Sequence, residues 1–94
     1  MAAYLIALRE RMKDAAEMEI YGKKAQAAGS AGMKALAVYG RLETLEGVPF
    51  EGAVVLEFPT LEAAKAWYDS PAYQEAKQHR LKGADYRFFI VQGL

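Results

Sequence analysis

The segment from residue 54 to residue 73 constrains the fold of this chain more than any other part. Residues 54–58 form a short stretch, apolar apart from Glu57, of the kind that makes a buried strand, and Pro59-Thr60 ends that stretch and caps a helix. The helix carries Trp67 on an apolar face, and Ser70-Pro71 then restarts it, because Ser is a favoured N-cap and Pro suits the first helical position. This segment therefore predicts a strand followed directly by a helix with one break.

The rest of the chain supplies three more strands and one more helix. Asp14, with Glu17 three residues later, predicts a capping box at the start of the first helix, and Gly29-Ser30-Ala31-Gly32 predicts its end. With 94 residues there is no room for a second core, so we expect a single domain over residues 1–94. We expect strands over residues 4–8, 36–45, 53–58 and 86–92, and helices over residues 14–28 and 60–82.

The order βαββαβ is typical of the ferredoxin-like sandwich. In that α+β fold, four antiparallel strands lie in the order 4-1-3-2 and both helices cover one face of the sheet. The strands themselves are apolar on both faces, as residues 5–8, 54–56 and 88–91 show. Two helices cover only one face, so we expect a homodimer whose sheets face each other, as in a dimeric α/β barrel. The alternative is a monomer with an exposed apolar sheet, which is uncommon.

The composition of the chain argues against several classes of function. Twelve basic and twelve acidic residues cancel, and no positive face is concentrated enough to favour nucleic acid or an anionic membrane as partner. The chain has no cysteine and one histidine, so we expect no metal site and no cofactor. It shows neither a basic leader nor a long apolar span, which favours a soluble, cytoplasmic protein.

A family resemblance runs along nearly the whole chain. The residues that carry it are Glu57-Phe58-Pro59-Thr60, Ala66-Trp67-Tyr68, Ser70-Pro71, Tyr73-Gln74, Arg80, Arg87 and Ile90-Val91-Gln92-Gly93. In these the chain resembles the domain-of-unknown-function 1330 family, within the dimeric α/β-barrel superfamily. One departure is Ala15, where a proline often follows the capping Asp. More distant relatives include cofactor-free monooxygenases, lactone isomerases and haem-binding enzymes, and the resemblance implies a ligand between sheet and helices.

Three side chains near one end of the expected fold are candidates for chemistry. His79 is the only side chain whose unperturbed titration lies near neutrality, and Arg87 opens the last strand beside the end of the first, so both are catalytic candidates. Arg80 and Arg87 are expected to converge with His79 and to bind a carboxylate, phosphate or enolate. The alternative is a set of solvated charges at strand and helix ends, neutralised by Asp85, Glu10 and Glu43.

Aromatic side chains form the second candidate set. Trp67, Tyr21 and Tyr39, with Tyr68 and Tyr4, would line a pocket for a flat aromatic ligand, although aromatics at this spacing also make ordinary cores. Glu57 is a conceivable general base or a solvated strand-end charge. Ser30 and Ser70 lie in loop or cap positions, so a serine triad has little support.

These observations leave more than one function open. The first is a cofactor-independent enzyme or a binder of a small acidic or aromatic metabolite, with Arg87 and Arg80 stabilising negative charge and His79 moving a proton. The alternative is a non-catalytic homodimeric accessory or interaction module. A haem binder ranks third, because His79 is the sole imidazole. A hollow between sheet and helices, with Arg87 pointing into it, would favour the first.

Overall fold

The protein is seen here in a computed structural model that describes residues 1–29 and 32–94. Ser30 and Ala31, which belong to the expected helix stop and include one candidate nucleophile, lie outside the described residues. The elements in chain order are β1 (Ala3–Met12), α1 (Ala15–Ala27), β2 (Lys34–Val38), β3 (Gly52–Phe58), α2 (Leu61–Asp69), α3 (Pro71–Gly83) and β4 (Ala84–Gln92).

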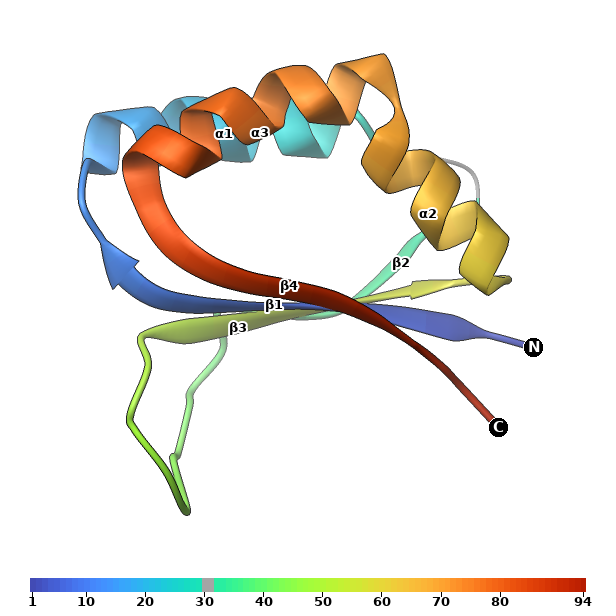
Figure 1. The fold of residues 1–94 in the computed structure, drawn as a ribbon, viewed down its shortest axis with the longest axis horizontal. Coiled ribbons are helices and arrows are strands. Elements are labelled where there is room, and N and C mark those ends of the chain that lie inside the picture. Colours follow the sequence, from blue (N-terminus) through green and yellow to red (C-terminus); the bar gives the residue numbers. More distant parts are fainter. Residues whose placement is uncertain (30–31) are drawn as a thin grey trace.

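The strands form one antiparallel sheet in the order β2-β3-β1-β4, which is the predicted order read from the other edge. The central register places Leu5 of β1 between Leu56 of β3 and Ile90 of β4. All the helices lie on one side of this sheet (Figure 1), and the predicted ferredoxin-like α+β fold is therefore confirmed.

Two strand boundaries differ from the prediction. β1 continues past Arg9 to Met12, because its pairing with β4 resumes at Arg11 and Met12 after a register shift. β2 ends at Val38 rather than at residue 45, since Tyr39 has a left-handed φ of 52° that breaks the extended backbone. Residues 39–51 then form a long arm without regular structure before β3 begins.

The start of α1 follows the prediction only in part. Asp14 is the N-cap, and its Oδ1 accepts hydrogen bonds from the backbone N–H groups of Ala16 and Glu17 at 3.0 and 3.3 Å. The return bond of a capping box is absent, because the Asp14 N–H donates to the Gly83 carbonyl at 2.9 Å. Glu17 is therefore released to contact His79 on α3.

The core lies between the sheet and the α2–α3 pair. Trp67 of α2 is buried there, its ring centroid 4.3 Å from that of Tyr73 and 5.7 Å from that of Phe58. Its indole Nε1–H donates to the Ala28 carbonyl at 2.9 Å, so the only tryptophan also holds the end of α1 in place. The buried cluster consists of Leu5, Ala7, Phe58, Ala64, Trp67, Tyr73 and Ala76.

The opposite face of the sheet carries no helix but is also apolar. Successive side chains of a strand point to opposite faces, so Ile6, Val55, Phe89 and Val91 lie on the side away from the helices. Phe89 and Val91 leave 43% and 47% of their surface exposed. No helix formed by the described residues has the length and apolar character needed to cross a membrane.

Replacing Trp67 with alanine should cost about 3–5 kcal/mol of unfolding free energy, because it removes a buried ring and the hydrogen bond to Ala28. Chemical denaturation measures this cost. Trp67→Phe keeps most of the packing and should lose clearly less. An unchanged denaturation midpoint in Trp67→Ala would contradict the observed packing of α2.

Candidate functional site

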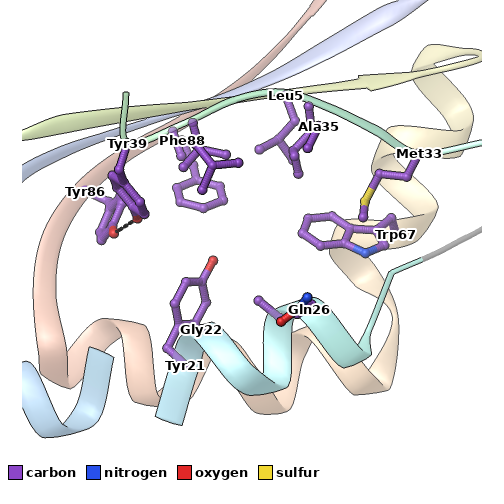
Figure 2. Close-up of a pocket in the computed structure, with 15 residues that line it drawn as sticks. Leu5, Tyr21, Gly22, Gln26, Met33, Ala35, Tyr39, Trp67, Tyr86 and Phe88 are labelled. Atoms are coloured by element: carbon purple, nitrogen blue, oxygen red, sulfur yellow. Dashed lines mark hydrogen bonds between the residues drawn. The ribbon is translucent and has the colours of Figure 1, made fainter. Parts of the chain in front are cut away.

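A cavity of about 410 Å³ lies between α1 and the helix-facing side of the sheet. Figure 2 shows the sheet residues Leu5, Ala35 and Phe88 on one side, with Tyr21 and Gly22 of α1 opposite them. Trp67 and Met33 lie at one end and the pair Tyr39 and Tyr86 at the other. The remaining lining residues are Ala7, Ala25, Gln26, Val38, Val54 and Leu56. Its volume and apolar lining are those of a small-molecule pocket.

The cavity exists because α1 packs chiefly against α3 and not against the sheet. Three side-chain pairs hold the two helices together: Glu17 with His79 at 2.6 Å, Tyr21 with Tyr73 at 3.0 Å, and Lys24 with Glu75 at 2.9 Å. The α1 residues that line the cavity include Gly22 and Ala25, which are too small to fill the space.

Gly22 marks the mouth of the cavity. A Cβ atom added at this position would meet no atom within 4 Å, so the glycine opens onto empty space. Gly22 and Gln26 on α1 are exposed, as are Ala35, Val38 and Tyr39 at the edge strand β2 and just beyond it. The cavity therefore opens to solvent between α1 and the edge of the sheet.

Two hydrogen-bonded phenols lie in the wall next to α3. The Tyr21 hydroxyl points into the cavity toward the sheet (Figure 2) and lies 3.0 Å from the Tyr73 hydroxyl, which is fully buried. Burial raises the pKa of Tyr21 and also raises the pKa of Tyr73. Both phenols therefore remain protonated near neutral pH and can donate a hydrogen bond.

Arg80 of α3 is a buried cation behind the same wall. Only 5% of its surface is exposed, and its Nε–H has no hydrogen-bond partner. Its guanidinium carbon lies 4.1 Å from the ring centroid of Phe88 and 5.5 Å from that of Tyr86. Among the described residues it forms no ion pair. Cation–π contact offsets part of the cost of burying this charge, and a carboxylate partner is missing.

Tyr39 and Tyr86 close the other end of the cavity. Their hydroxyl groups, one from the residue after β2 and one from β4, are hydrogen-bonded to each other (Figure 2), and burial raises the pKa of Tyr86. Arg9 stacks on the Tyr39 ring at 4.6 Å and pairs with Glu51 at 3.3 Å. A Cβ atom on Gly52 would lie 2.7 Å from Tyr39 Cδ1, so that glycine makes room for the ring.

The structure brings together only part of the predicted site. Trp67, Tyr21 and Tyr39 line one cavity, while their role in ligand binding stays a prediction. Arg80 lies behind the cavity wall. His79 is not among the lining residues, because its Nδ1 lies 2.6 Å from Glu17 Oε2 between α3 and α1.

The expected convergence of Arg87 with Arg80 and His79 is wrong. Tyr86 and Phe88 face the cavity, so the strand pleat turns the intervening Arg87 to the helix-free face, where it is exposed. Glu57 is paired with Tyr4 on that same face, away from the cavity.

Sequence reasoning missed Tyr73, Tyr86 and Gly22 as parts of the site. Tyr73 and Arg80 are seven residues apart on one helix, a spacing that places them on a common face. Tyr86 and Phe88 share the alternation of β4. These two patterns could have grouped the residues, but the sequence does not determine which face of the strand packs against the helices.

With fold and cavity described, the chain can be placed among known proteins. It is a ferredoxin-like α+β protein with a cavity beneath its helices. Residues 2–94 match the family described as "Domain of unknown function (DUF1330)", and the chain belongs to that family. The resemblance found in the sequence is thus confirmed. A search of curated proteins found no match.

Solved structures share the fold at low sequence identity. The protein RPA0582 of Rhodopseudomonas palustris, of unknown function, is 22% identical with a TM-score of 0.75, over 99% of this chain and 82% of that one. A dimeric ferredoxin-like protein of unknown function from Thermobifida fusca is 18% identical with a TM-score of 0.67, over 97% and 90%. A dimeric protein of unknown function with a ferredoxin-like fold, from Bacteroides fragilis, is 16% identical with a TM-score of 0.63, over 98% and 96%.

The buried phenols should resist ionisation as long as the protein is folded. Folding raises the pKa of Tyr21, Tyr73 and Tyr86 above the ordinary value of 10.0, so the unfolded chain loses these protons first. Their contribution to stability should therefore be complete below about pH 10 and decline as the pH rises above it. Titration of tyrosinate absorbance, with denaturation at each pH, measures both effects.

Tyr21→Phe is the control for this titration. It should remove one late-titrating group and weaken the alkaline loss of stability. Ionisation of all six tyrosines together near pH 10 in the folded protein would contradict the described burial.

Proposed function

We propose that this protein is a homodimer that binds a small, flat, largely apolar molecule in the cavity between α1 and the sheet. The cavity itself carries the proposal: about 410 Å³ of space with aliphatic and aromatic walls and an opening beside Gly22. An apolar molecule entering it would remove both its own surface and the cavity walls from water. Trp67, Tyr21 and Tyr39 are the side chains offered for aromatic contact.

Binding is better supported than acid–base catalysis. The titratable side chains among the described lining residues are Tyr21, Tyr39 and Tyr86, and none is a carboxylate, an imidazole or an amine. A general base for neutral pH requires a group that is deprotonated there. His79 already contacts Glu17, and Arg87 lies on the other face of the sheet. A cofactor-independent enzyme would need a proton carrier in the cavity, and His79, the predicted carrier, is not among the lining residues.

The second part of the proposal is the homodimer. The helix-free face presents a continuous apolar set that includes Ile6, Val55, Phe89 and Val91. The arm of residues 39–51 extends past this face (Figure 1), with Leu45 and Val48 exposed by 85% and 88%. A second copy would cover both, and two of the similar solved proteins are described as dimeric.

A homodimeric interaction module without a ligand is the second candidate function. The exposed Leu45 and Val48 on the arm favour it, since apolar side chains at a loop tip are typical of protein contacts. It differs from the first candidate in leaving the cavity without an occupant.

Filling the cavity mouth tests the binding function. Wild-type protein should bind acetylnaphthalene, and the bound probe should quench the fluorescence of Trp67, which lines the cavity. Gly22→Leu places a side chain in the open space and should weaken binding by about tenfold or more, a loss of roughly 1.4 kcal/mol. Gly22→Ala is the matched control: affinity should stay within about threefold, and stability should rise by about 0.5–1 kcal/mol because helical glycine is unfavourable.

Equal affinity of the Gly22→Leu and Gly22→Ala variants would place the probe elsewhere. Absence of binding to wild type, together with an intact dimer, would favour the interaction module.

Charge on the helix-free face tests the homodimer. Phe89→Glu should convert the wild-type dimer into a monomer near 10.4 kDa at about 10 μM, because it buries a charge in an apolar contact. Lys23→Glu, on the exposed side of α1, is the control and should stay dimeric. Sedimentation velocity separates the two. A wild-type monomer at that concentration would contradict this part of the proposal.

A further inference from the structure

The polar wall of the cavity indicates what kind of ligand it accepts, and this inference rests on the proposed binding function. We propose that the ligand is an aromatic or similarly flat molecule with a carboxylate, whose oxygen accepts a hydrogen bond from the Tyr21 hydroxyl. Arg80 and Tyr73 are positioning residues in this arrangement: they keep the Tyr21 hydroxyl oriented as a donor and supply positive charge behind it.

The first argument is the direction of the hydrogen bonds. A guanidinium group has donors only, so Arg80 can act on the Tyr73 hydroxyl only through the oxygen of that hydroxyl. Arg80 lies close enough to counteract part of the pKa increase that burial causes at Tyr73. The hydrogen bond between the Tyr73 and Tyr21 hydroxyls is 3.0 Å long, and either oxygen can be its donor. In the ligand-bound arrangement of this proposal, Tyr73 donates to the Tyr21 oxygen. The Tyr21 hydroxyl, which points into the cavity (Figure 2), can then donate its own proton to a ligand.

The second argument is the unpaired charge of Arg80. This side chain is 95% buried, since 5% of its surface is exposed, and its Nε–H has no partner. Buried arginines normally meet a carboxylate, and among the described residues Arg80 has none. The rings on which it stacks, Phe88 and Tyr86, themselves line the cavity, so the charge lies directly behind the wall. A negative ligand group in the cavity would supply the missing counter-charge.

The third argument is the small number of hydrogen-bonding groups on the cavity surface. Apart from Tyr21, the described walls offer the Gln26 amide at the mouth and the Tyr39–Tyr86 pair, whose hydroxyls are bonded to each other. The indole N–H of Trp67 is already donated to Ala28. Among these groups, Tyr21 is the donor that lies beside the buried Arg80, and this combination suits a carboxylate on an apolar body better than a phosphate or a sugar, which need several donors.

Three naphthalene probes of matched shape test this proposal by titration calorimetry. We expect wild type to bind naphthoate more tightly than neutral acetylnaphthalene, and acetylnaphthalene more tightly than naphthalene. Tyr21→Phe should weaken naphthoate binding by about tenfold or more, because a hydrogen bond to a charged group is lost, and should change naphthalene binding by less than about twofold.

Two further variants test the positioning residues. Arg80→Met keeps a long apolar side chain over Phe88 without the charge, and should abolish the preference for naphthoate over acetylnaphthalene while preserving naphthalene binding. Tyr73→Phe removes the hydrogen bond between Tyr73 and Tyr21 while leaving the Tyr21 hydroxyl in place, and should weaken naphthoate binding by about threefold. Circular dichroism of each variant verifies the fold, and retained naphthalene binding verifies the cavity.

Each result separates this inference from the binding function on which it rests. If wild type binds all three probes equally, or if Tyr21→Phe weakens naphthalene and naphthoate by the same factor, the carboxylate proposal is overturned while the cavity remains a binding site. If none of the probes binds wild type, the binding function is overturned and the carboxylate proposal with it.

Discussion

The docking of α1 on α3 is the contact on which the rest of the structure depends. In a sandwich of helices on a sheet, an amphipathic helix normally buries its apolar side chains directly on the strands. Here three pairs, Glu17–His79, Tyr21–Tyr73 and Lys24–Glu75, join α1 sideways to α3. Since the cavity-lining positions of α1 include Gly22 and Ala25, the space above β2 and β3 is left open. The cavity is thus a result of which helix faces are large and which are small.

The same contact explains the unusual polarity of the core. Tyr73 is fully buried and places its hydroxyl beside that of Tyr21, so a polar pair is carried into an otherwise apolar layer. Arg80, two turns further along α3, is buried on the rings of Phe88 and Tyr86 without an ion pair among the described residues. Apolar residues would fill these positions at lower cost if packing were the only requirement. A buried polar group without a complete set of partners is a common mark of a binding site.

The second constraint acts on the other face of the sheet. β1, β3 and β4 are apolar on both sides, and all the helices lie on one of them (Figure 1). Tyr39, with its left-handed backbone, ends β2 early and sends residues 39–51 out past the uncovered face. Its ring packs over Gly52, its hydroxyl bonds Tyr86 and Arg9 stacks on it, so one residue joins the cavity end to the base of the arm. The cavity and the arm that extends past the helix-free face are thus connected through Tyr39.

The sequence by itself determined the element order and the two apolar faces, because these follow from local periodicity and from caps such as Asp14, Thr60 and Ser70. The strand order was predicted from the fold of which this element order is typical, and the family was predicted from a resemblance along the chain. The sequence also identified Trp67, Tyr21 and Tyr39 as aromatics that would lie together, and the structure places all three around one cavity. It did not place Arg87, because a strand pattern that is apolar on both faces does not say which face meets the helices. One step of the pleat turns Arg87 away and Phe88 inward. Only the tertiary structure decided that Glu17 engages His79, that Arg80 is buried without a carboxylate, and that Gly22 opens onto empty space. These are contacts between residues far apart in the chain, which no local pattern encodes.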